Sequence, residues 1–289
     1  MRISSHTKLA TLIGHPVSHS ISPQIHNFLA EEYGEDLRYL SFDVEPDHVK
    51  EAIAGMRALG IIGSNVTIPH KIAVMECLDE IDRNACIIGA VNTIKNDNGR
   101  LIGYNTDALG FVNSVLNEGH CVKGKHVMIL GAGGASRAIA VELAAHGVNR
   151  LTLCNNTLQK AEAIAEKVKE NFSEVEVSVK PLDVKSEDLK GVDFLINTTP
   201  LGMSSQKDLC PIDESIIPPK GLVVCDIVYT PHNTKLLKWA MSHELQVVHG
   251  IGMLISQAIT SFEIWTGLKI DAYDKVYQLL KTEGILKEE

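Results

Sequence analysis

A glycine-rich run, Gly131-Ala132-Gly133-Gly134-Ala135-Ser136-Arg137, has the composition and spacing of a loop that holds a phosphate group. It follows the apolar segment 127–130 and precedes a helical pattern that ends near His146. The first glycine permits a tight turn, the second lets a pyrophosphate approach the backbone, and the helix N-terminus supplies N–H donors. The strict motif has Gly or Ala where Ser136 stands. The strand before the run and the helix after it predict a dinucleotide site rather than a plain turn.

Hydroxyl and imidazole side chains are concentrated in a second segment, residues 14–23, which also follows an apolar strand. His15, His19 and His26 have the spacing of one helical face, which would suit a metal ion. Prolines at 16 and 23 interrupt such a helix, and no carboxylate or cysteine joins the histidines. We therefore expect no metal site here.

Two interpretations of that segment remain, and both concern its serines. In the first, Ser22 caps the following helix and Pro23 takes the first helical position. In the second, a loop at a strand end presents Ser20 and Ser22 to a polar ligand, where α/β sheets usually bind. Capping and ligand binding can coexist in neighbouring serines.

Lys71 ends a third notable segment, Asn65-Val66-Thr67-Ile68-Pro69-His70-Lys71. Pro69 predicts a helix over 70–79, which would place Lys71 in its first turn. A helix dipole disfavours a cation there, which promotes loss of the proton that a catalytic base must shed. A solvated surface lysine is the ordinary alternative.

Two further polar residues have ordinary explanations when taken singly. Asp107 precedes a helix expected to begin near Ala108, where an aspartate is a common N-cap. Asn92, in Ala90-Val91-Asn92-Thr93, would be a turn or strand-end residue.

The second half of the chain alternates short apolar strands with amphipathic helices. We expect strands near 126–130, 150–154, 175–180, 192–197, 222–228 and 245–249. Between the second and third of these, Leu158, Ala161, Ala165, Val168 and Phe172 have the spacing of one buried helical face. Such alternation implies right-handed crossovers and a doubly wound parallel sheet, so the fold class is α/β with a Rossmann domain.

The first hundred residues predict a second α/β unit with a mixed sheet. Strands are expected at 9–13, 37–43, 61–66, 91–96 and 101–105, and helices at 22–33, 46–59 and 70–79. Asn96-Asp97-Asn98-Gly99 is a strong hairpin signal between the last two strands. The tail from Met253 to Leu286 has a helical pattern.

Composition narrows the class of protein. The 289 residues allow roughly two domains, and 45% hydrophobic residues are ample for packed cores. A net charge of −9 without a basic stripe argues against nucleic-acid binding. The six cysteines form no C-x-x-C pair, and no signal peptide or membrane span is indicated, so we expect a cytoplasmic protein with reduced thiols.

Taken together, these segments resemble the shikimate dehydrogenase family over nearly the whole chain. Eight blocks in the family's order carry the resemblance. They are Ser20–Pro23, Asn65–Lys71, Ala90–Thr93, Gly103–Asp107, Gly131–Arg137, Ile196–Met203, Asp226–Pro231 and Gly250–Gln257. The resemblance implies a substrate domain, residues 1–106 completed by 251–289, that faces a dinucleotide-binding domain, residues 107–250, across a cleft.

The resemblance also implies a role for individual residues. Lys71 and Asp107 match the family's catalytic pair. Positions that hold the substrate carboxylate match Ser20, Ser22 and Tyr229, and those that bind ring hydroxyls match Thr67, Asn92, Asp107 and Gln257. Positions on the cofactor side match Gly131, Ala132, Gly133, Gly134, Ala135, Asn155, Asn156, Thr157, Lys160, Ile227, Gly250 and Met253.

The implied activity is the reversible NADP-dependent reduction of 3-dehydroshikimate to shikimate, a step towards chorismate and the aromatic amino acids. Neutral Lys71 would accept the hydroxyl proton as hydride leaves for the nicotinamide, and its ammonium would return that proton in reverse. A monomer or homodimer acting on a small molecule is expected.

Cofactor and substrate alternatives stay open at this point. Many relatives carry an arginine for the 2′-phosphate where Asn156 stands, whereas NAD enzymes often have an acidic residue there. Thr157 and Lys160, with Arg137 as a helper, can still bind a phosphate, so NADP is favoured over NAD or dual use. A quinate/shikimate dehydrogenase shares the same blocks. A non-catalytic dinucleotide-binding regulator would not need both Lys71 and Asp107.

Overall fold

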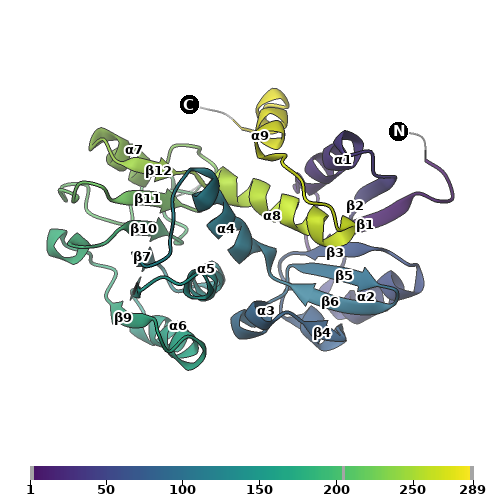
Figure 1. Cartoon of the computed structure of the whole chain (residues 1–289), viewed down its shortest axis with the longest axis horizontal. Helices are drawn as coiled ribbons and strands as arrows, with labels where there is room; N and C mark the ends of the chain where they lie inside the picture. The colour runs from purple at the N-terminus through teal and green to yellow at the C-terminus, as the bar shows by residue number, and fades with distance from the viewer. Residues whose placement is uncertain (1–2, 204–205, 287–289) are drawn as a thin grey trace. The chain divides into compact units, whose positions relative to one another are not determined.

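The computed structural model describes residues 3–203 and 206–286. Within them the chain divides into two compact units (Figure 1). The first unit contains the chain up to Thr106 together with Gln257–Thr282. The second contains Asp107–Ser256 and the residues from Glu283 on. The domain roles assigned from the family pattern stay a prediction.

The first unit is built on a six-stranded mixed sheet in the order β2-β1-β3-β5-β6-β4. Its strands are β1 (Lys8–Gly14), β2 (Leu37–Asp43), β3 (Gly63–Val66), β4 (Glu80–Ile81), β5 (Thr93–Asp97) and β6 (Arg100–Tyr104). β2 and β3 are parallel to β1, whereas β5 is antiparallel to both β3 and β6. The predicted hairpin is confirmed, with Asn98 and Gly99 both at positive φ.

Helices cover this sheet, and their apolar spacing explains why. In α2 (Val49–Ala58), Val49, Ile53 and Met56 form one buried face and pack in the same core as Ile13 and Ile94. The other helical elements are α1 (Ser22–Glu32), η1 (Pro46–His48), η2 (Ala73–Cys77), α3 (Arg83–Ile88), α8 (Gly250–Thr266) and α9 (Tyr273–Thr282), of which α8 begins in the second unit.

One expectation about a helix is wrong. No α-helix covers 70–79; a turn leads into the short 3₁₀ helix η2, and β4 and α3 follow unpredicted. Helix α3 is capped at both ends: the Asp82 carboxylate accepts from the N–H groups of Asn84 and Ala85, and Gly89 ends the helix in the left-handed conformation. The helical pattern expected for the tail is confirmed: it forms α8 and α9, and Gly267, at φ 77°, ends α8.

The second unit is built on a six-stranded parallel sheet in the order β12-β11-β10-β7-β8-β9. Its strands are β7 (His126–Leu130), β8 (Arg150–Cys154), β9 (Glu176–Lys180), β10 (Phe194–Asn197), β11 (Val223–Asp226) and β12 (Gln246–Val248). Counted along the chain, this is the 3-2-1-4-5-6 order of a Rossmann-like domain. The predicted parallel sheet is confirmed, with strand ends within two residues of expectation.

Helices α4 (Thr106–Asn117), α5 (Gly134–Ala145), α6 (Leu158–Asn171) and α7 (Lys235–Ser242), with the 3₁₀ helix η3 (Ser186–Leu189), complete this unit. Strand order reverses direction at β10, so right-handed crossovers place the helices of the two halves on opposite faces. Leu236, Trp239 and Ala240 of α7 pack in one core with Met128 and Leu195.

The six cysteines are free thiols. Cys154 and Cys225 are buried in strands, where burial raises the pKa of each thiol, that of Cys154 to about 12. Cys86 and Cys121 are exposed instead. Among the described helices, none combines the length and the apolar character needed to cross a membrane.

Candidate active site

The topology of the first unit brings several of the predicted substrate residues to one edge of its sheet. β1 and β3 are parallel, so the loops that carry Ser20 and Thr67 leave the sheet at the same edge. β5 is antiparallel to β3, with Thr93 opposite Asn65, so Asn92 enters from that edge. β6 runs back beside β5 and places Tyr104 opposite Thr93. Because the strands run in both directions, polar side chains from distant parts of the sequence lie at the same edge of the sheet.

Ser20 and Ser22 are half-buried and lie beside each other, with their hydroxyl oxygens 3.1 Å apart. The expected N-cap at Ser22 is wrong: α1 begins at Ser22 and its N-cap is Ile21. The Ser22 N–H donates to Ser20 Oγ at 3.2 Å, which holds the two serines together at the start of the helix.

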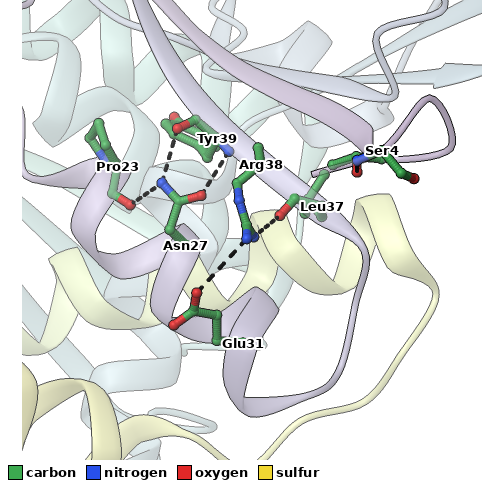
Figure 2. A network of polar contacts seen from close by, with 8 residues as sticks. Ser4, Pro23, Asn27, Glu31, Leu37, Arg38 and Tyr39 are labelled. Carbon is green, nitrogen blue, oxygen red and sulfur yellow. Dashed lines mark hydrogen bonds and ion pairs between the residues drawn. The ribbon is translucent and has the colours of Figure 1, made fainter. Parts of the chain in front are cut away.

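Asn27 holds α1 against the edge strand β2, as Figure 2 shows. Its Nδ2 donates to the carbonyls of Pro23 and Tyr39, at 2.8 and 3.0 Å, and its Oδ1 accepts from the Tyr39 N–H. The helix N-terminus that carries Ser22 is thus tied to the sheet by paired hydrogen bonds.

Two histidines of this region have structural partners. His15 Nδ1 lies 2.5 Å from Asp43 Oδ1. His26 is fully buried and stacked on Tyr39, with 4.3 Å between the ring centroids. Burial lowers the pKa of His26 to about 3, with Asn65 acting in the opposite direction. The Tyr39 phenol donates to Asn65 Oδ1 at 2.8 Å.

Thr67 follows β3 and is half-buried. Gly14, at the end of β1, makes room for it: a Cβ on Gly14 would lie 2.2 Å from the Thr67 methyl carbon. The Thr67 N–H donates to the Ile13 carbonyl at 2.9 Å, which fixes the backbone at the strand end.

Lys71 lies in the turn between β3 and η2, half-buried. Because no α-helix begins there, the expected action of a helix dipole on the amine is wrong. The turn is held by a different contact, since the Val91 N–H donates to the Lys71 carbonyl at 2.8 Å. That bond joins the Lys71 turn to the residue before Asn92.

Asp107 lies inside the first turn of α4, which begins at Thr106, so it is not the N-cap. Asn92 is nearly buried, and its Oδ1 accepts from the Thr106 N–H at 2.7 Å. This bond ties the start of α4 to Asn92. Gln257, also buried, belongs to α8.

The glycine-rich run of the second unit has the form that a phosphate site requires. Gly131 has φ +105°, and a Cβ there would lie 2.7 Å from Thr198 Oγ1, so only glycine fits. Nothing lies within 4 Å of a Cβ built on Gly133 or Gly134. Helix α5 begins after Gly133 without a side-chain cap among the described residues, which leaves its first N–H groups to an anion.

Ser136 explains the departure from the strict motif, and Arg137 follows it in the first turn of α5. Ser136 is fully buried, and its hydroxyl donates to the Gly131 carbonyl at 2.8 Å, so a small polar residue satisfies the turn. The Nε atom of Arg137 is buried without a hydrogen-bond partner among the described residues. An anionic ligand would supply one.

The loop after β8 would hold the other end of a dinucleotide. Asn155 Nδ2 donates to the Thr157 carbonyl at 2.8 Å and shapes the loop. Asn156, Thr157 and Lys160 are exposed, and Thr157, the N-cap of α6, makes no side-chain capping bond among the described residues. One lysine, two hydroxyl or amide groups and a helix N-terminus suit a phosphate.

A buried carboxylate fixes the loop after β11. Asp226 accepts from the Thr234 hydroxyl at 2.7 Å, the Val228 N–H at 2.9 Å and Asn197 Nδ2 at 3.0 Å. Burial raises the pKa of Asp226 to about 6, although the three hydrogen bonds act to lower it. The loop carries Ile227, half-buried, and Tyr229, exposed.

Two residues of α8 complete the predicted cofactor set. Gly250, its first residue, packs so closely that a Cβ would lie 2.6 Å from the Ile227 carbonyl carbon and oxygen. Met253 is half-buried one turn further on. The predicted cofactor residues thus follow the ends of β7, β8, β11 and β12, four strands of one sheet.

Sequence reasoning missed the polar residues that position these groups. They are Asn65, Thr93, Thr106 and Ser261 in the first unit and Asn197, Asp226 and Thr234 in the second. Several lie inside the family-like blocks, but no local pattern reveals that they bond to one another.

Comparison with known proteins agrees with this architecture. Family models match residues 12–94 (shikimate dehydrogenase substrate binding domain), 113–206 (shikimate / quinate 5-dehydrogenase) and 250–281 (shikimate 5′-dehydrogenase C-terminal domain). The shikimate dehydrogenase (NADP(+)) of Methanocaldococcus jannaschii is 48% identical over 92% of this chain and 94% of its own length.

Solved structures give the same answer. A crystal structure of a shikimate dehydrogenase in complex with NADP+ has a TM-score of 0.89 at 43% identity, covering 98% of this chain and 97% of that one. A shikimate 5-dehydrogenase from Listeria monocytogenes in complex with shikimate and NAD has a TM-score of 0.91 at 33% identity, covering 97% and 98%. The chain therefore belongs to the shikimate dehydrogenase family.

Proposed function

We propose that this protein oxidises shikimate to 3-dehydroshikimate with NADP+ and catalyses the reverse reduction. The observation that carries the proposal is the convergence of Ser20, Thr67, Lys71 and Asn92 at one edge of the first unit's sheet. These side chains supply hydroxyl, amine and amide groups, which suit a small polyhydroxylated acid.

Lys71 would move the proton. Its neutral amine would accept the proton of the reacting hydroxyl, and its ammonium would return it in the reductive direction. Asp107, the second member of the proposed catalytic pair, would orient the amine and bind a ring hydroxyl. Bound NADP+ would take the hydride that leaves the same carbon.

The remaining proposed substrate residues would orient the acid. Ser20 and Ser22, whose hydroxyls already lie 3.1 Å apart, offer two donors to a carboxylate, and Tyr229 offers a third. Thr67, Asn92 and Gln257 would bind the ring hydroxyls, which sets which carbon reacts.

The second unit fits the cofactor. The open glycines 133 and 134, the uncapped start of α5 and the buried Nε of Arg137 suit a pyrophosphate. Asn155, Asn156, Thr157 and Lys160 would hold the 2′-phosphate of NADP, with Lys160 as its cation. Ile227, Gly250 and Met253 would line the nicotinamide end.

A two-by-two assay tests the proposal: shikimate and quinate, each with NADP+ and NAD+, followed by absorbance of the reduced cofactor. We expect the highest kcat/KM for shikimate with NADP+. A tenfold or greater preference for NAD+ would contradict the cofactor assignment, and higher kcat/KM for quinate would contradict the substrate. No reduction in any of the four mixtures would favour a non-catalytic regulator.

The place of the reaction in the cell follows from its product. We propose that the protein serves chorismate and aromatic amino acid biosynthesis in the cytoplasm, as a monomer or homodimer. The absence of a basic stripe in the sequence supports a small-molecule partner over a nucleic acid.

A further inference from the structure

Five buried polar side chains of the first unit form one cluster. The amide–hydroxyl cluster consists of Asn65, Asn92, Thr93, Thr106 and Ser261, each 6% exposed or less. It joins strands β3 and β5, the start of α4 and the helix α8. None of its members carries a charge, so the cluster costs less to bury than an ion pair would.

Thr93 lies at the centre of this cluster and is fully buried. Its Oγ1 lies 3.1 Å from Asn65 Nδ2, 3.1 Å from Asn92 Oδ1, 2.9 Å from Thr106 Oγ1 and 2.9 Å from Ser261 Oγ. Each of the other four members therefore contacts this one hydroxyl.

The cluster determines which atom Asn92 can offer to a ligand. Its Oδ1 accepts from the Thr106 N–H at 2.7 Å, the Thr106 hydroxyl at 3.2 Å and the Thr93 hydroxyl at 3.1 Å. A backbone N–H can only donate, so the acceptor must be the carboxamide oxygen. Because oxygen and nitrogen occupy opposite branches of one planar group, fixing Oδ1 also fixes the direction of Nδ2.

Ser261 connects the same cluster to Gln257. Its hydroxyl donates to the Gln257 carbonyl, one turn earlier in α8, at 2.9 Å. A serine has one proton to donate, so Ser261 accepts from Asn65 Nδ2 at 3.0 Å. The helical turn that carries Gln257 is thereby tied to β3.

We propose that Thr93 is a positioning residue for substrate binding: its hydroxyl donates to Asn92 Oδ1 and, together with the Thr106 N–H, orients the carboxamide so that Nδ2 donates to a ring hydroxyl. This inference rests on the proposed function, because it assigns Asn92 to shikimate. Thr93 itself touches no substrate in this arrangement.

Thr93→Val tests the proposal, since valine keeps the shape of threonine and removes the hydroxyl. Shikimate binding is measured by calorimetry without cofactor, and kcat and KM by NADPH formation. We expect the Kd and KM for shikimate to rise about tenfold, the value that corresponds to about 1.4 kcal/mol. The Kd for NADP+ should stay within about twofold, since the cluster lies wholly in the first unit.

Thr152→Val is the matched control. Thr152 is also buried in a central strand, β8 of the second unit, and its hydroxyl contacts His126 Nε2 at 2.9 Å and Ser178 Oγ at 3.1 Å. The same atom is removed, but shikimate affinity should not change. Thr93→Ser restores the hydroxyl and should return the Kd to within about threefold of wild type.

Each outcome decides the question. Unchanged shikimate affinity in a folded Thr93→Val protein, or an equal loss of NADP+ affinity, overturns the inference alone. If Thr93→Val does not fold, Thr93→Ala takes its place, because it also removes the hydroxyl, and an unchanged shikimate Kd there overturns the inference equally. A wild-type protein that neither binds nor oxidises shikimate would overturn the proposed function and this inference together.

Discussion

The two units solve the same problem, holding loops at the ends of strands, with different chemistry. The first unit uses the uncharged amide–hydroxyl cluster and a buried histidine, whereas the second uses a buried carboxylate, Asp226, bonded to three donors. Their sheets differ too, one mixed and one parallel. Sheet topology therefore decides where polar groups gather, and the side chains chosen decide how each unit responds to charge and pH.

The largest effect should come from the residue that makes the first unit reactive. Lys71→Met removes the proposed proton acceptor, and we expect kcat for shikimate oxidation to fall by about 10²–10⁴-fold. The Kd for NADP+ should be unchanged, because the proposed cofactor residues belong to the second unit.

Lys95→Met is a suitable control, since Lys95 is a half-buried lysine on β5 with no proposed role. It should leave kcat within about twofold of wild type, as most substitutions away from a site do. An unchanged kcat in Lys71→Met would remove this lysine from the mechanism.

The second prediction is an opposite pH response of the two units between about pH 4 and 6.5. Burial lowers the pKa of His26 from 6.5 to about 3, so the unfolded chain binds a proton that the folded unit excludes. The stability that His26 contributes to the first unit thus rises with pH, by up to about 5 kcal/mol.

Asp226 gives the opposite sign. Burial raises its pKa from 3.8 to about 6, so the folded second unit keeps a proton that the unfolded chain has lost. Its contribution to the stability of the second unit is greatest at low pH and falls by up to about 3 kcal/mol as pH rises to 6.

The two tryptophans report the units separately, because Trp265 belongs to the first and Trp239 to the second. Urea unfolding of Trp239→Phe follows the first unit, and that of Trp265→Phe follows the second. In these backgrounds, His26→Phe should abolish the rise in the stability of the first unit with increasing pH. Asp226→Asn should abolish the fall in the stability of the second unit over the same range. Difference curves of the same sign for both substitutions would refute the contrast.

The third and smallest expected effect concerns the glycine-rich loop. Gly131→Ala places a Cβ at φ +105° and 2.7 Å from Thr198 Oγ1, so the loop must shift. We expect the Kd for NADP+ to rise about tenfold, the equivalent of about 1.4 kcal/mol. Shikimate affinity measured without cofactor should be unaffected, and a parallel loss of both affinities would argue against separate sites.

The repeating parts of the fold could be predicted from the sequence. Runs such as 126–130 and 150–154 are short, apolar and bounded by turns, so strand positions followed from them. The prediction of an α-helix over 70–79 failed because a proline and a short apolar pattern are equally compatible with a turn followed by a 3₁₀ helix. Helix α3 is six residues long, too short for periodicity, although Asp82 and Gly89 marked its ends.

Only those residues of the candidate site that lie in the family's local sequence motifs could be predicted. Lys71, Asn92 and the glycine run belong to local motifs, but Thr93 and Ser261 are 168 residues apart and each is ordinary in its own element. Their contact depends on strand order and on the packing of α8 against the sheet, where Gly63 leaves room for the Trp265 ring. Such long-range pairing has no signature in a single sequence.

A crystal structure with bound shikimate would show whether the first unit holds the substrate. We expect ring hydroxyls within hydrogen-bonding distance of Lys71 Nζ, Asn92 Nδ2 and Thr67 Oγ1, at the strand-end edge of the first unit. Shikimate bound only elsewhere, with Asn92 Nδ2 and Lys71 Nζ making no contact to it, would rule out the proposed substrate site.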